Sequence, residues 1–528
     1  MHSQLYPGWE LWLPSSAITG IEGTDSRLRT TLDAQACRSA SAGFFNAVTS
    51  ATEAQFVLPI PVGAVLSECA LYEMAIVVNA EAEVEILFSD EDRIDVTGRR
   101  CQPWFKTGWD PDLALGRDAV GLVVAYRKEL LVRVGGMRAA DAGIGSELYE
   151  LSLRAGYGTL PTRIRHLPRI LCHRHGLSWG ACEQDSEAGR RIVRTFLCDR
   201  GEEVRVAPAP LTPQWNKLGY SLPSPAPLVS VIVPTRKGGE MLARCAEGVL
   251  QRTGYPRIEL LIADNTSAAG ETETLVEALS GDRRVRVIPF PGSFNFAAIN
   301  NHAAREARGN VLVLLNDDTE VISRDWLTEL VSHAVRPGVG AVGAKLIYPD
   351  GRLQHAGMVL GPGTFMNHQF RFADRYDPGP NGECALTRTI WAVTGACLAV
   401  QRAVFFEVGG MNEADFAVAF SDVDFCMRLG DYGYRVVWTP FAELIHVEGG
   451  TRGYDDTPEK VAIAEREQRA FRALWGTLLD ADPYRNPNLV QGWEHLSLAA
   501  PPCQARAETM EIARLSCSAP GSAPSGCA

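Results

Sequence analysis

Short apolar runs alternate with amphipathic stretches along residues 228–315, and this alternation constrains the fold more than any other feature of the sequence. The apolar runs of strand length are LVSVIV at 228–233, IELLIA at 258–263, VRVI at 285–288 and NVLVLL at 310–315. The stretches with helical spacing are 240–252, 271–280 and 296–308. Strands that alternate with helices form βαβ units. The sequence therefore predicts a Rossmann-like α/β fold with a mainly parallel sheet, whose ligands bind beyond the carboxyl ends of the strands.

The chain also contains a weaker upstream copy of this pattern. The matching pairs are YPGWEL (6–11) with YPRIEL (255–260), QFVLPI (55–60) with NVLVLL (310–315), and VGGM at both 134–137 and 408–411. Since single cores rarely exceed about 250–300 residues, a chain of 528 residues is predicted to hold two such units in tandem. Met1–Leu5 leaves no room for a counterpart of 228–233. We therefore expect an edge strand of the first unit to be missing or supplied from elsewhere, although a misassigned start codon would leave the same pattern.

Composition and proline spacing predict four segments. Residues 1–200 form the first unit, and residues 229–490 form the second. Residues 201–228 form a linker, because six prolines there disfavour both helix and central strand: Pro208, Pro210, Pro213, Pro223, Pro225 and Pro227. Residues 491–528, rich in small residues and proline, are expected to be largely disordered.

Charge and hydropathy exclude several classes of protein. No run approaches the roughly 18 apolar residues of a membrane-spanning helix, and no basic segment leads into an apolar one at the start. A net charge of -12 without a stripe of Lys, Arg and aromatics argues against nucleic acid as a partner. The thirteen cysteines show no C-x-x-C pair or zinc-like spacing. The protein is expected to be cytoplasmic, with peripheral association at the inner face of the membrane left open.

Acidic side chains follow two of the predicted strands. Asp264 comes directly after 258–263, and Asn316, Asp317 and Asp318 come directly after 310–315. Because carboxyl ends of parallel strands meet at one edge, these side chains should face one crevice. Their hard oxygen atoms suit Mg²⁺ or Mn²⁺ bridging a diphosphate. The same acids could instead cap helices, so the pattern alone leaves both roles open.

Two further residues could complete a site. Asp422 begins the helix of SDVDFCMRLGDYGY, where it could cap the helix or act as a general base, and Asp424 competes for either role. His446 follows the strand-like AELI and precedes VEGGTRG, a loop that carries Arg452. His446 could be structural, or it could complete a metal site while Arg452 reaches a phosphate.

The second half resembles glycosyltransferase family 2, which has the GT-A fold. The resemblance lies in VSVIVPTRKGGEMLARCAEGVL, IELLIADN, FNFAAINNHAAREARGNVLVLLNDDTEVIS, GAKLIYPDGRLQHAGMVLG, AVTGACLAV and SDVDFCMRLGDYGYRVVWTP followed by HVEGGTRG. It covers this half nearly end to end. Within the family the chain is most similar to bacterial surface-polysaccharide transferases of the rhamnosyltransferase type.

The resemblance implies a role for each candidate residue. The donor-binding set is Pro234, Thr235, Asp264, Asn265, Asn316, Asp317 and Arg452, with Asp264 contacting the base. Asn316 and Asp318 occupy the outer positions of the D-x-D motif, and Asp318 and His446 are the implied metal ligands. Asp422 falls where the family has its catalytic base. Trp391 and the turn 394–397 fall in the acceptor region. Asn316 stands where much of the family has Asp, which predicts a modest metal affinity.

These assignments predict an inverting, metal-dependent transferase. It would move a sugar from a nucleotide-diphosphate donor, with dTDP-rhamnose as the leading guess, to a growing surface glycan or lipid-linked acceptor. Two alternatives stay open. One is an inactive glycan-binding scaffold, and the other is a sugar nucleotidyltransferase, for which PTRKGGE offers Arg236 and Lys237. No oligomeric state is predicted.

The first half resembles the same family, but it has lost the acids. Its matching points are Ser15, Gly63, Leu148 and His173, where the second half has Asp264, Asp318, Asp422 and His446. Neither Gly63 nor Leu148 can bind a metal or accept a proton. The first unit is therefore predicted to be inactive, unless SDED at 89–92 restores a metal site. We expect it to pack against the second unit, bind acceptor glycan or dock a partner.

Overall fold

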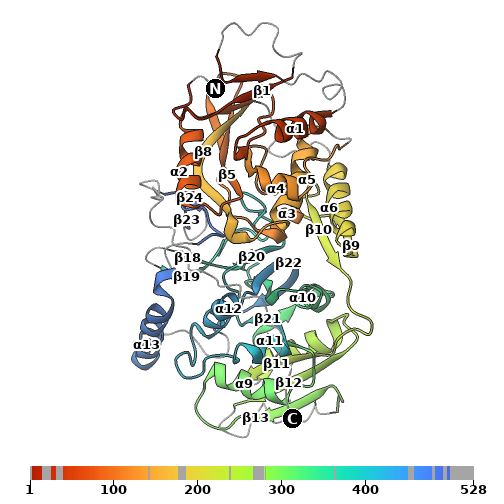
Figure 1. Cartoon of the computed structure of the whole chain (residues 1–528). Helices are drawn as coiled ribbons and strands as arrows, with labels where there is room; N and C mark the ends of the chain where they lie inside the picture. Colours follow the sequence, from red (N-terminus) through yellow and green to blue (C-terminus); the bar gives the residue numbers. More distant parts are fainter. Residues whose placement is uncertain are drawn as a thin grey trace, which may run out of the picture.

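The chain forms two α/β bodies that lie end to end along the long axis of the molecule (Figure 1). The computed structural model describes residues 3–14, 25–30, 40–140, 143–175, 186–236, 239–265, 279, 281–361, 364–449, 457–478, 482–491 and 496–499. The predicted helix 271–280 and most of the predicted tail fall outside these residues. The α/β class predicted from the sequence is confirmed.

The second unit is built on a sheet that has ten strands in the described residues, in the order β13-β12-β11-β14-β21-β16-β22-β15, with β17 and β20 paired to β16 and β22. Its strands are β11 (Val229–Thr235), β12 (Ile258–Asp264), β13 (Val285–Pro289), β14 (Val311–Leu315), β15 (Thr319–Val321), β16 (Val339–Ile347), β17 (Leu353–His355), β20 (Arg388–Ile390), β21 (Cys397–Gln401) and β22 (Arg435–His446). The four strands predicted from the apolar runs are parallel neighbours, whereas β21 is antiparallel to both β14 and β16. The sheet is therefore mixed rather than mainly parallel.

Helices cover both faces of this sheet, which explains the continuous apolar runs. They are α7 (Gly239–Glu247), α9 (Phe296–Glu306), α10 (Trp326–Ala334), α11 (Arg402–Glu407), α12 (Ser421–Asp431) and α13 (Pro458–Trp475). Helices α9, α11, α12 and α13 share one hydrophobic cluster, and α7 and α10 share the other. Alternate strand residues serve the two clusters, so Leu312 lies in the first and Val313 in the second. Helices packed on both faces thus hold this sheet in place.

The first unit repeats the second half of this sheet in the same order and with the same strand directions. Its order β3-β7-β5-β8-β4 corresponds to β14-β21-β16-β22-β15, with one parallel pair, β5 with β8, matching β16 with β22. The strands are β3 (Phe56–Val57), β4 (Ala64–Leu66), β5 (Ile86–Ile94), β6 (Arg100–Trp104), β7 (Val124–Arg127) and β8 (Ile164–His175). Its helices are α1 (Ala40–Ala51), α2 (Ala70–Ala80), α3 (Pro111–Gly116), α4 (Lys128–Arg133), α5 (Ile144–Tyr157) and α6 (Ser186–Asp199).

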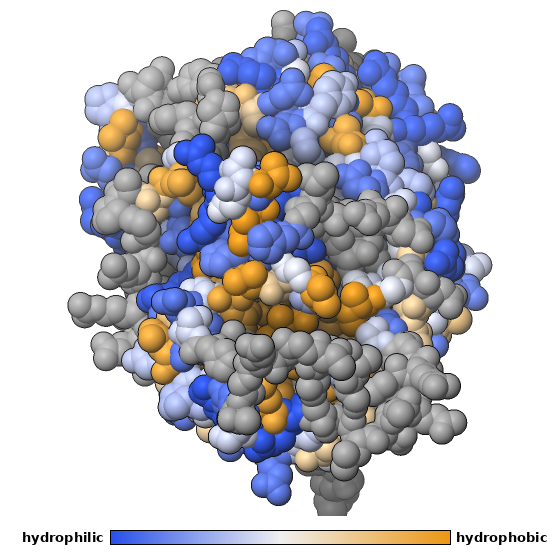
Figure 2. Space-filling view, turned by 90° about the horizontal axis from the view of Figure 1, so that it is seen from above, coloured by the Kyte–Doolittle hydropathy of each residue, from blue (hydrophilic) through white to orange (hydrophobic). Residues whose placement is uncertain are grey.

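The strand that has no counterpart in the first unit is central rather than at an edge. Strands β1 (Leu11–Leu13) and β2 (Leu28–Thr30) form a separate parallel pair, as β12 and β13 do within the second sheet. In the second unit β11 lies between β12 and β14, whereas in the described residues no strand joins β1 to β3. The expectation of a missing edge strand is corrected accordingly. The end of the molecule that carries this unit shows a band of apolar side chains between polar ones (Figure 2).

The segment predicted to be a linker contains a hairpin. Strands β9 (Val204–Pro208) and β10 (Asn216–Tyr220) pair antiparallel, and Val206 and Leu218 pack with the core of the first unit. The prolines are accommodated because most of them lie outside the paired residues. At the other end, β23 (Leu489–Gln491) pairs with β24 (Leu496–Leu498), so ordered pairing continues into the segment predicted to be a disordered tail.

Candidate active site

The carboxyl ends of β11, β12 and β14 bring the predicted donor-binding residues to one edge of the sheet. Thr235 and Asp264 are register partners, and the Thr235 hydroxyl donates a hydrogen bond of 2.8 Å to Asp317. The backbone N–H of Asn265 donates to the carbonyl of Thr235 at 2.9 Å. Its side-chain amide donates to the carbonyls of Phe290 and Gly292, which closes the turn after β13. Asp317 and Asn265 thus hold the loops, while Asp264 lies at the edge itself.

Asp318 and His446 form the centre of this edge. Antiparallel pairing of β15 with β22 sets Thr319 opposite His446, which brings His446 Nε2 to 3.2 Å from Asp318 Oδ1. The side-chain amide nitrogen of Asn316 lies 3.3 Å from the same Nε2. Asp318 is only 5% exposed and His446 only 9%, so both groups are largely desolvated. The two residues predicted as metal ligands therefore lie side by side.

The donor atoms of this pair fit a divalent cation. Two ligands bound at about 2.0–2.2 Å in neighbouring octahedral positions lie roughly 3 Å apart, close to the 3.2 Å between Asp318 Oδ1 and His446 Nε2. Among the described residues, however, no group of three or more His, Cys, Asp and Glu side chains could hold a metal. A cation here would need further oxygen ligands, such as the side-chain carbonyl of Asn316 and a bound diphosphate.

Asp422 lies in the first turn of α12 against the turn that precedes β21. Its Oδ2 accepts a hydrogen bond of 2.7 Å from the backbone N–H of Gly395, and its Oδ1 accepts one of 2.9 Å from its neighbour Val423. Burial raises the pKa of the Asp422 carboxyl, and the N–H of Gly395 offsets part of that increase. The preceding residue but one, Phe420, has a left-handed backbone with φ of 60°. Such strain in a non-glycine residue is typical of functional sites.

The competition between Asp422 and Asp424 is resolved by their contacts. Asp424 is 1% exposed and points into the core, where it accepts from Arg428 at 2.8 Å and from the Trp475 indole N–H at 3.1 Å. Both its oxygens are therefore engaged, one with Arg428 within α12 and the other with Trp475 on α13. Asp424 is structural, and Asp422 is the acid of this helix that faces the turn at Gly395.

Glu467 was missed by the sequence reasoning, yet it supports the loop that carries Asp422. This side chain on α13 is fully buried, and its carboxylate accepts from the backbone N–H groups of Ala417 and Ala419 at 3.1 and 2.6 Å. Phe471, one turn later, stacks on Phe420 with ring centroids 5.0 Å apart. Residue type and spacing do not indicate this role, because the partners of Glu467 are backbone groups.

The turn 394–397 links the acid to the candidate cation pair. Its Gly395 bonds Asp422, and the carbonyl of the next residue, Ala396, accepts from the N–H of Asn316 at 3.0 Å. Trp391, also expected in the acceptor region, packs edge-on to Tyr484 at 5.9 Å, and its indole nitrogen has no hydrogen-bond partner among the described residues. Pro234 is the last residue but one of β11 and is buried. Arg452 lies outside the described residues.

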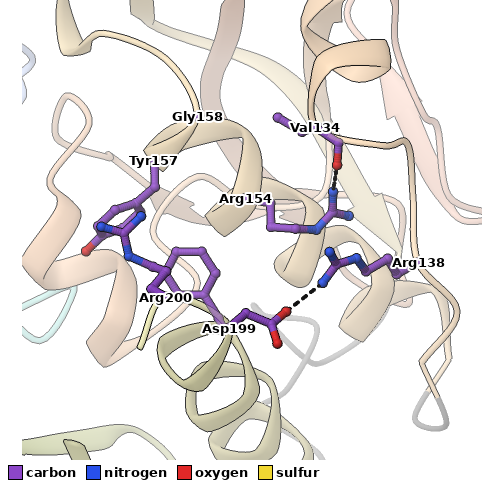
Figure 3. Close-up of a pocket in the computed structure, with 8 residues that line it drawn as sticks. Val134, Arg138, Arg154, Tyr157, Gly158, Asp199 and Arg200 are labelled. Atoms are coloured by element: carbon purple, nitrogen blue, oxygen red, sulfur yellow. Dashed lines mark hydrogen bonds and ion pairs between the residues drawn. The ribbon is translucent and has the colours of Figure 1, made fainter. Parts of the chain in front are cut away.

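The first unit has the same arginine-to-loop hydrogen bonds as the second unit, but an apolar residue, Leu148, lies at the position of Asp422. Arg154 on α5 donates to the carbonyls of Val134 and Gly136, and Arg428 on α12 donates to those of Val408 and Gly410 (Figure 3 shows the Arg154 bond). Both arginines therefore lock the repeated VGGM loop in the same way. The shared spacing puts Leu148, which is 1% exposed, at the position of Asp422. Gly63 ends the turn before β4, and Ser15 lies outside the described residues.

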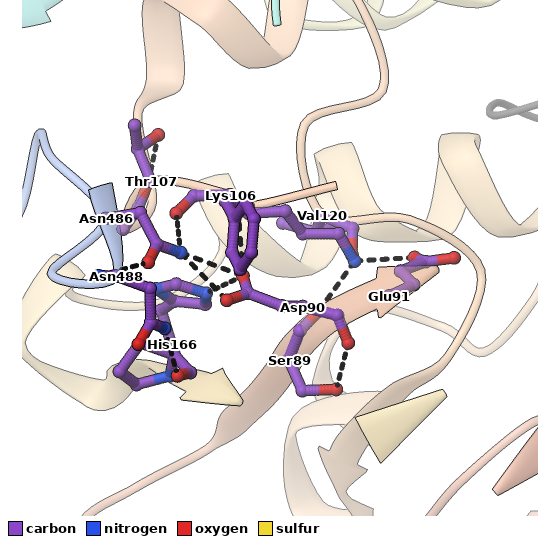
Figure 4. Close-up of polar contacts among 12 residues, drawn as sticks. Ser89, Asp90, Glu91, Lys106, Thr107, Val120, His166, Asn486 and Asn488 are labelled. Atoms are coloured by element: carbon purple, nitrogen blue, oxygen red, sulfur yellow. Dashed lines mark hydrogen bonds and ion pairs between the residues drawn. The ribbon is translucent and has the colours of Figure 1, made fainter. Parts of the chain in front are cut away.

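The acids of SDED in the first unit are engaged with internal partners rather than gathered around an open site (Figure 4). Lys106 Nζ contacts Glu91 at 2.5 Å, and its backbone N–H donates to Asp90. Asp90 also accepts from the side-chain amide of Asn486, at 2.8 Å, and lies 2.7 Å from His166. The buried ammonium group of Lys106 thus lies against Glu91, where a metal cation would otherwise have to bind. Asp90 fixes the C-terminal segment of the chain to the first unit through Asn486.

The chain is similar in sequence to known proteins. Residues 230–406 match the family model described as Glycosyl transferase family 2. Over 96% of its length the chain is 35% identical to the O-antigen biosynthesis protein RfbC of Myxococcus xanthus. Over 47% of its length it is 28% identical to the N-acetylglucosaminyl-diphospho-decaprenol L-rhamnosyltransferase of Mycobacterium tuberculosis, of which it covers 87%. The resemblance identified in the sequence is thereby confirmed.

The relatives that match the chain nearly end to end are longer than it is. The chain spans 56% and 39% of the length of two such curated relatives. Among solved structures, a mannosyltransferase from Pyrobaculum calidifontis, in complex with GDP-Man and Mn²⁺, is 19% identical with a TM-score of 0.35, over 55% of this chain and 75% of that one. In the described part of this chain, no helix is both long and apolar enough to cross a membrane.

Proposed function

We propose that this chain, whose residues 230–406 belong to glycosyltransferase family 2, transfers a sugar from a nucleotide-diphosphate donor to a hydroxyl of a glycan or lipid-linked acceptor. The observation that carries the proposal is the turn 394–397. It bonds the partly buried carboxylate of Asp422 through Gly395, and it bonds the backbone of Asn316, beside Asp318, through Ala396. A base and a diphosphate site held by one turn are what group transfer at an anomeric carbon requires.

The roles of the residues follow from their positions. Asp422 would accept the proton of the acceptor hydroxyl as that oxygen bonds to the anomeric carbon. The bond from this carbon to the diphosphate breaks, and its electron pair leaves with the nucleoside diphosphate. Attack opposite the leaving group inverts the anomeric configuration. A divalent cation held by Asp318 and His446 would supply neutralising charge to the diphosphate. Asp317 and Thr235, bonded to each other, would keep the carboxyl ends of β11 and β14 in place.

The donor and acceptor are proposed from the relatives. The Mycobacterium tuberculosis protein is named as an L-rhamnosyltransferase acting on a diphospho-decaprenol, and the Myxococcus xanthus protein is named for O-antigen biosynthesis. These names favour dTDP-rhamnose as donor and a lipid-linked or surface glycan as acceptor. The first unit, with Leu148 at the place of the base, would serve as a non-catalytic partner of the second.

Donor turnover by the purified chain tests this function. With Mn²⁺ or Mg²⁺ and a panel of nucleotide sugars, we expect slow release of nucleoside diphosphate from one donor, measured by chromatography. Removing the cation with a chelator should lower this rate by about 100-fold or more, since metal stabilisation of the leaving charge contributes several kcal/mol. Release of pyrophosphate would instead indicate nucleotidyl transfer, and absence of turnover with every donor and acceptor would indicate a non-catalytic protein.

The pH dependence of transfer should report the ionisation of the proposed base, Asp422. Asp422 acts only when ionised, and burial raises the pKa of its carboxyl above the ordinary value of about 3.9. The acidic limb of kcat/KM should therefore lie at higher pH than for an exposed aspartate. Rates measured between about pH 4 and 8 at saturating metal would check this. A profile flat down to the ordinary aspartate value would contradict the assignment.

A further inference from the structure

We infer that Gln354 is a positioning residue that selects the tautomer of His446, so that the lone pair of Nε2 points at the cation site. The inference rests on the proposed function, because it deepens the role of the Asp318–His446 pair. Gln354 lies on β17 and is 2% exposed, so water cannot satisfy its amide. Its hydrogen bonds to the protein therefore determine its orientation.

The orientation of the Gln354 amide is fixed by the backbone. Its Nε2 lies 3.2 Å from the carbonyl oxygen of His446 and 3.3 Å from a carboxylate oxygen of Glu448. The backbone carbonyl of His446 can only accept, so the group that faces it must be the NH₂ end of the amide. The amide oxygen is then left to face His446.

This orientation determines which nitrogen of His446 carries the proton. Gln354 Oε1 lies 2.7 Å from His446 Nδ1, and an amide oxygen can only accept. Nδ1 must therefore carry the hydrogen, and in the neutral ring Nε2 keeps its lone pair. That lone pair faces Asp318 Oδ1 at 3.2 Å and the Asn316 amide nitrogen at 3.3 Å. A lone pair directed at a carboxylate is favourable only with a cation or proton between them.

Other residues hold Gln354 in this role. Glu448, whose backbone is left-handed with φ of 55°, accepts from the hydroxyl of Tyr348 at 2.6 Å and pairs with Arg371 at 2.9 Å. Turning the Gln354 amide over would set its oxygen against the oxygen of the His446 carbonyl. The reversed orientation would therefore leave that carbonyl without its donor. Metal-bound histidines commonly have such a partner at the far ring nitrogen, and its loss costs about 10–100-fold in metal affinity.

Replacing Gln354 with methionine tests the inference, because methionine has a similar length and no amide. In the donor-free protein, we expect the dissociation constant for Mn²⁺, measured by electron paramagnetic resonance of the free ion, to rise by about 10–100-fold. Gln401→Met is the matched control, since Gln401 donates to the carbonyl of Ala334 on another part of the sheet. It should leave Mn²⁺ affinity unchanged. Thermal unfolding of all variants would show whether they are folded.

A spectroscopic measurement reads the tautomer directly. In the wild type at alkaline pH, nitrogen-15 NMR of the His446 ring, assigned with His446→Gln, should show hydrogen on Nδ1, and Gln354→Met should shift the ring toward a mixture of tautomers. Equal Mn²⁺ affinities in wild type and Gln354→Met, or hydrogen on Nε2 in the wild type, would overturn the inference. Failure of every nucleotide sugar to turn over would instead overturn the proposed function, while the NMR result would stand.

Discussion

Replacing Asp422 with asparagine is expected to lower the rate of sugar transfer by about 10²–10⁴-fold, the usual contribution of a general base. Asparagine can still accept the hydrogen bond that Asp422 takes from Gly395, so the turn 394–397 should keep its place. It cannot take a proton from the acceptor. Donor binding should change little, because Asp422 is not among the residues at the ends of β11, β12 and β14. Steady-state transfer rates and donor titration would measure the two effects separately.

The same substitution should not destabilise the protein. The fold raises the pKa of the Asp422 carboxyl, so its ionised form costs stability, and this cost grows as the pH rises above the pKa in the unfolded chain. At neutral pH asparagine removes that cost. The unfolding temperature of Asp422→Asn should therefore equal or exceed that of the wild type, as is common when an active-site charge is removed.

Asp431 provides the matched control. It lies at the other end of α12, and its carboxyl pKa is also raised by burial. Asp431→Asn should retain near wild-type turnover. Near wild-type turnover in Asp422→Asn would sink the assignment of the base, and a large loss in both variants would show that the helix, rather than one carboxylate, is sensitive to substitution.

Local patterns predicted the parts of the fold whose residues are buried on both sides. The four runs at 228–233, 258–263, 285–288 and 310–315 became β11, β12, β13 and β14, because strands covered on both faces are continuously apolar. Such runs do not encode the direction of a strand. The sequence therefore did not predict the antiparallel β21, which makes the sheet mixed. The hairpin of β9 and β10 was not predicted, because a high density of proline disfavours helix and central strand. The paired residues of this hairpin largely avoid the prolines.

The residue types and the preceding strands predicted that Asp318 and His446 would lie near each other, as they do, but such patterns do not reveal residues whose partners are distant in sequence. Spacing alone does not separate Asp422 from Asp424, because both lie in the first turn of α12. Their contacts with Gly395 and with Trp475, both distant in sequence, distinguish them. Gln354 and Glu467 carried no signal, since several of their partners are backbone groups.

Replacing Arg336 with alanine is expected to destabilise the whole chain by about 3–5 kcal/mol, because it removes the nearest cation from a buried carboxylate between the two units and leaves only Arg435, at 3.8 Å. Asp112 on α3 of the first unit is 4% exposed, and it accepts from Arg336 of the second unit at 2.6 Å and from the Thr389 hydroxyl at 3.1 Å. Burial alone would raise the pKa of Asp112, but Arg336 and Arg435 outweigh it and hold that pKa well below its usual range. The urea concentration at half-unfolding would measure the loss.

Three comparisons make this prediction specific to the interface. Arg352→Ala breaks an exposed pair with Asp350 and should cost about 0–1 kcal/mol. The double variant Asp112→Leu with Arg336→Met removes both charges, so it should cost less than Arg336→Ala alone. The fragment 225–528 lacks α3 altogether and leaves Arg336, Arg435 and Thr389 without Asp112, so it should unfold at lower urea than the full chain. A fragment as stable and as active as the full chain, together with a neutral Arg336→Ala, would mean that the first unit neither supports nor serves the second.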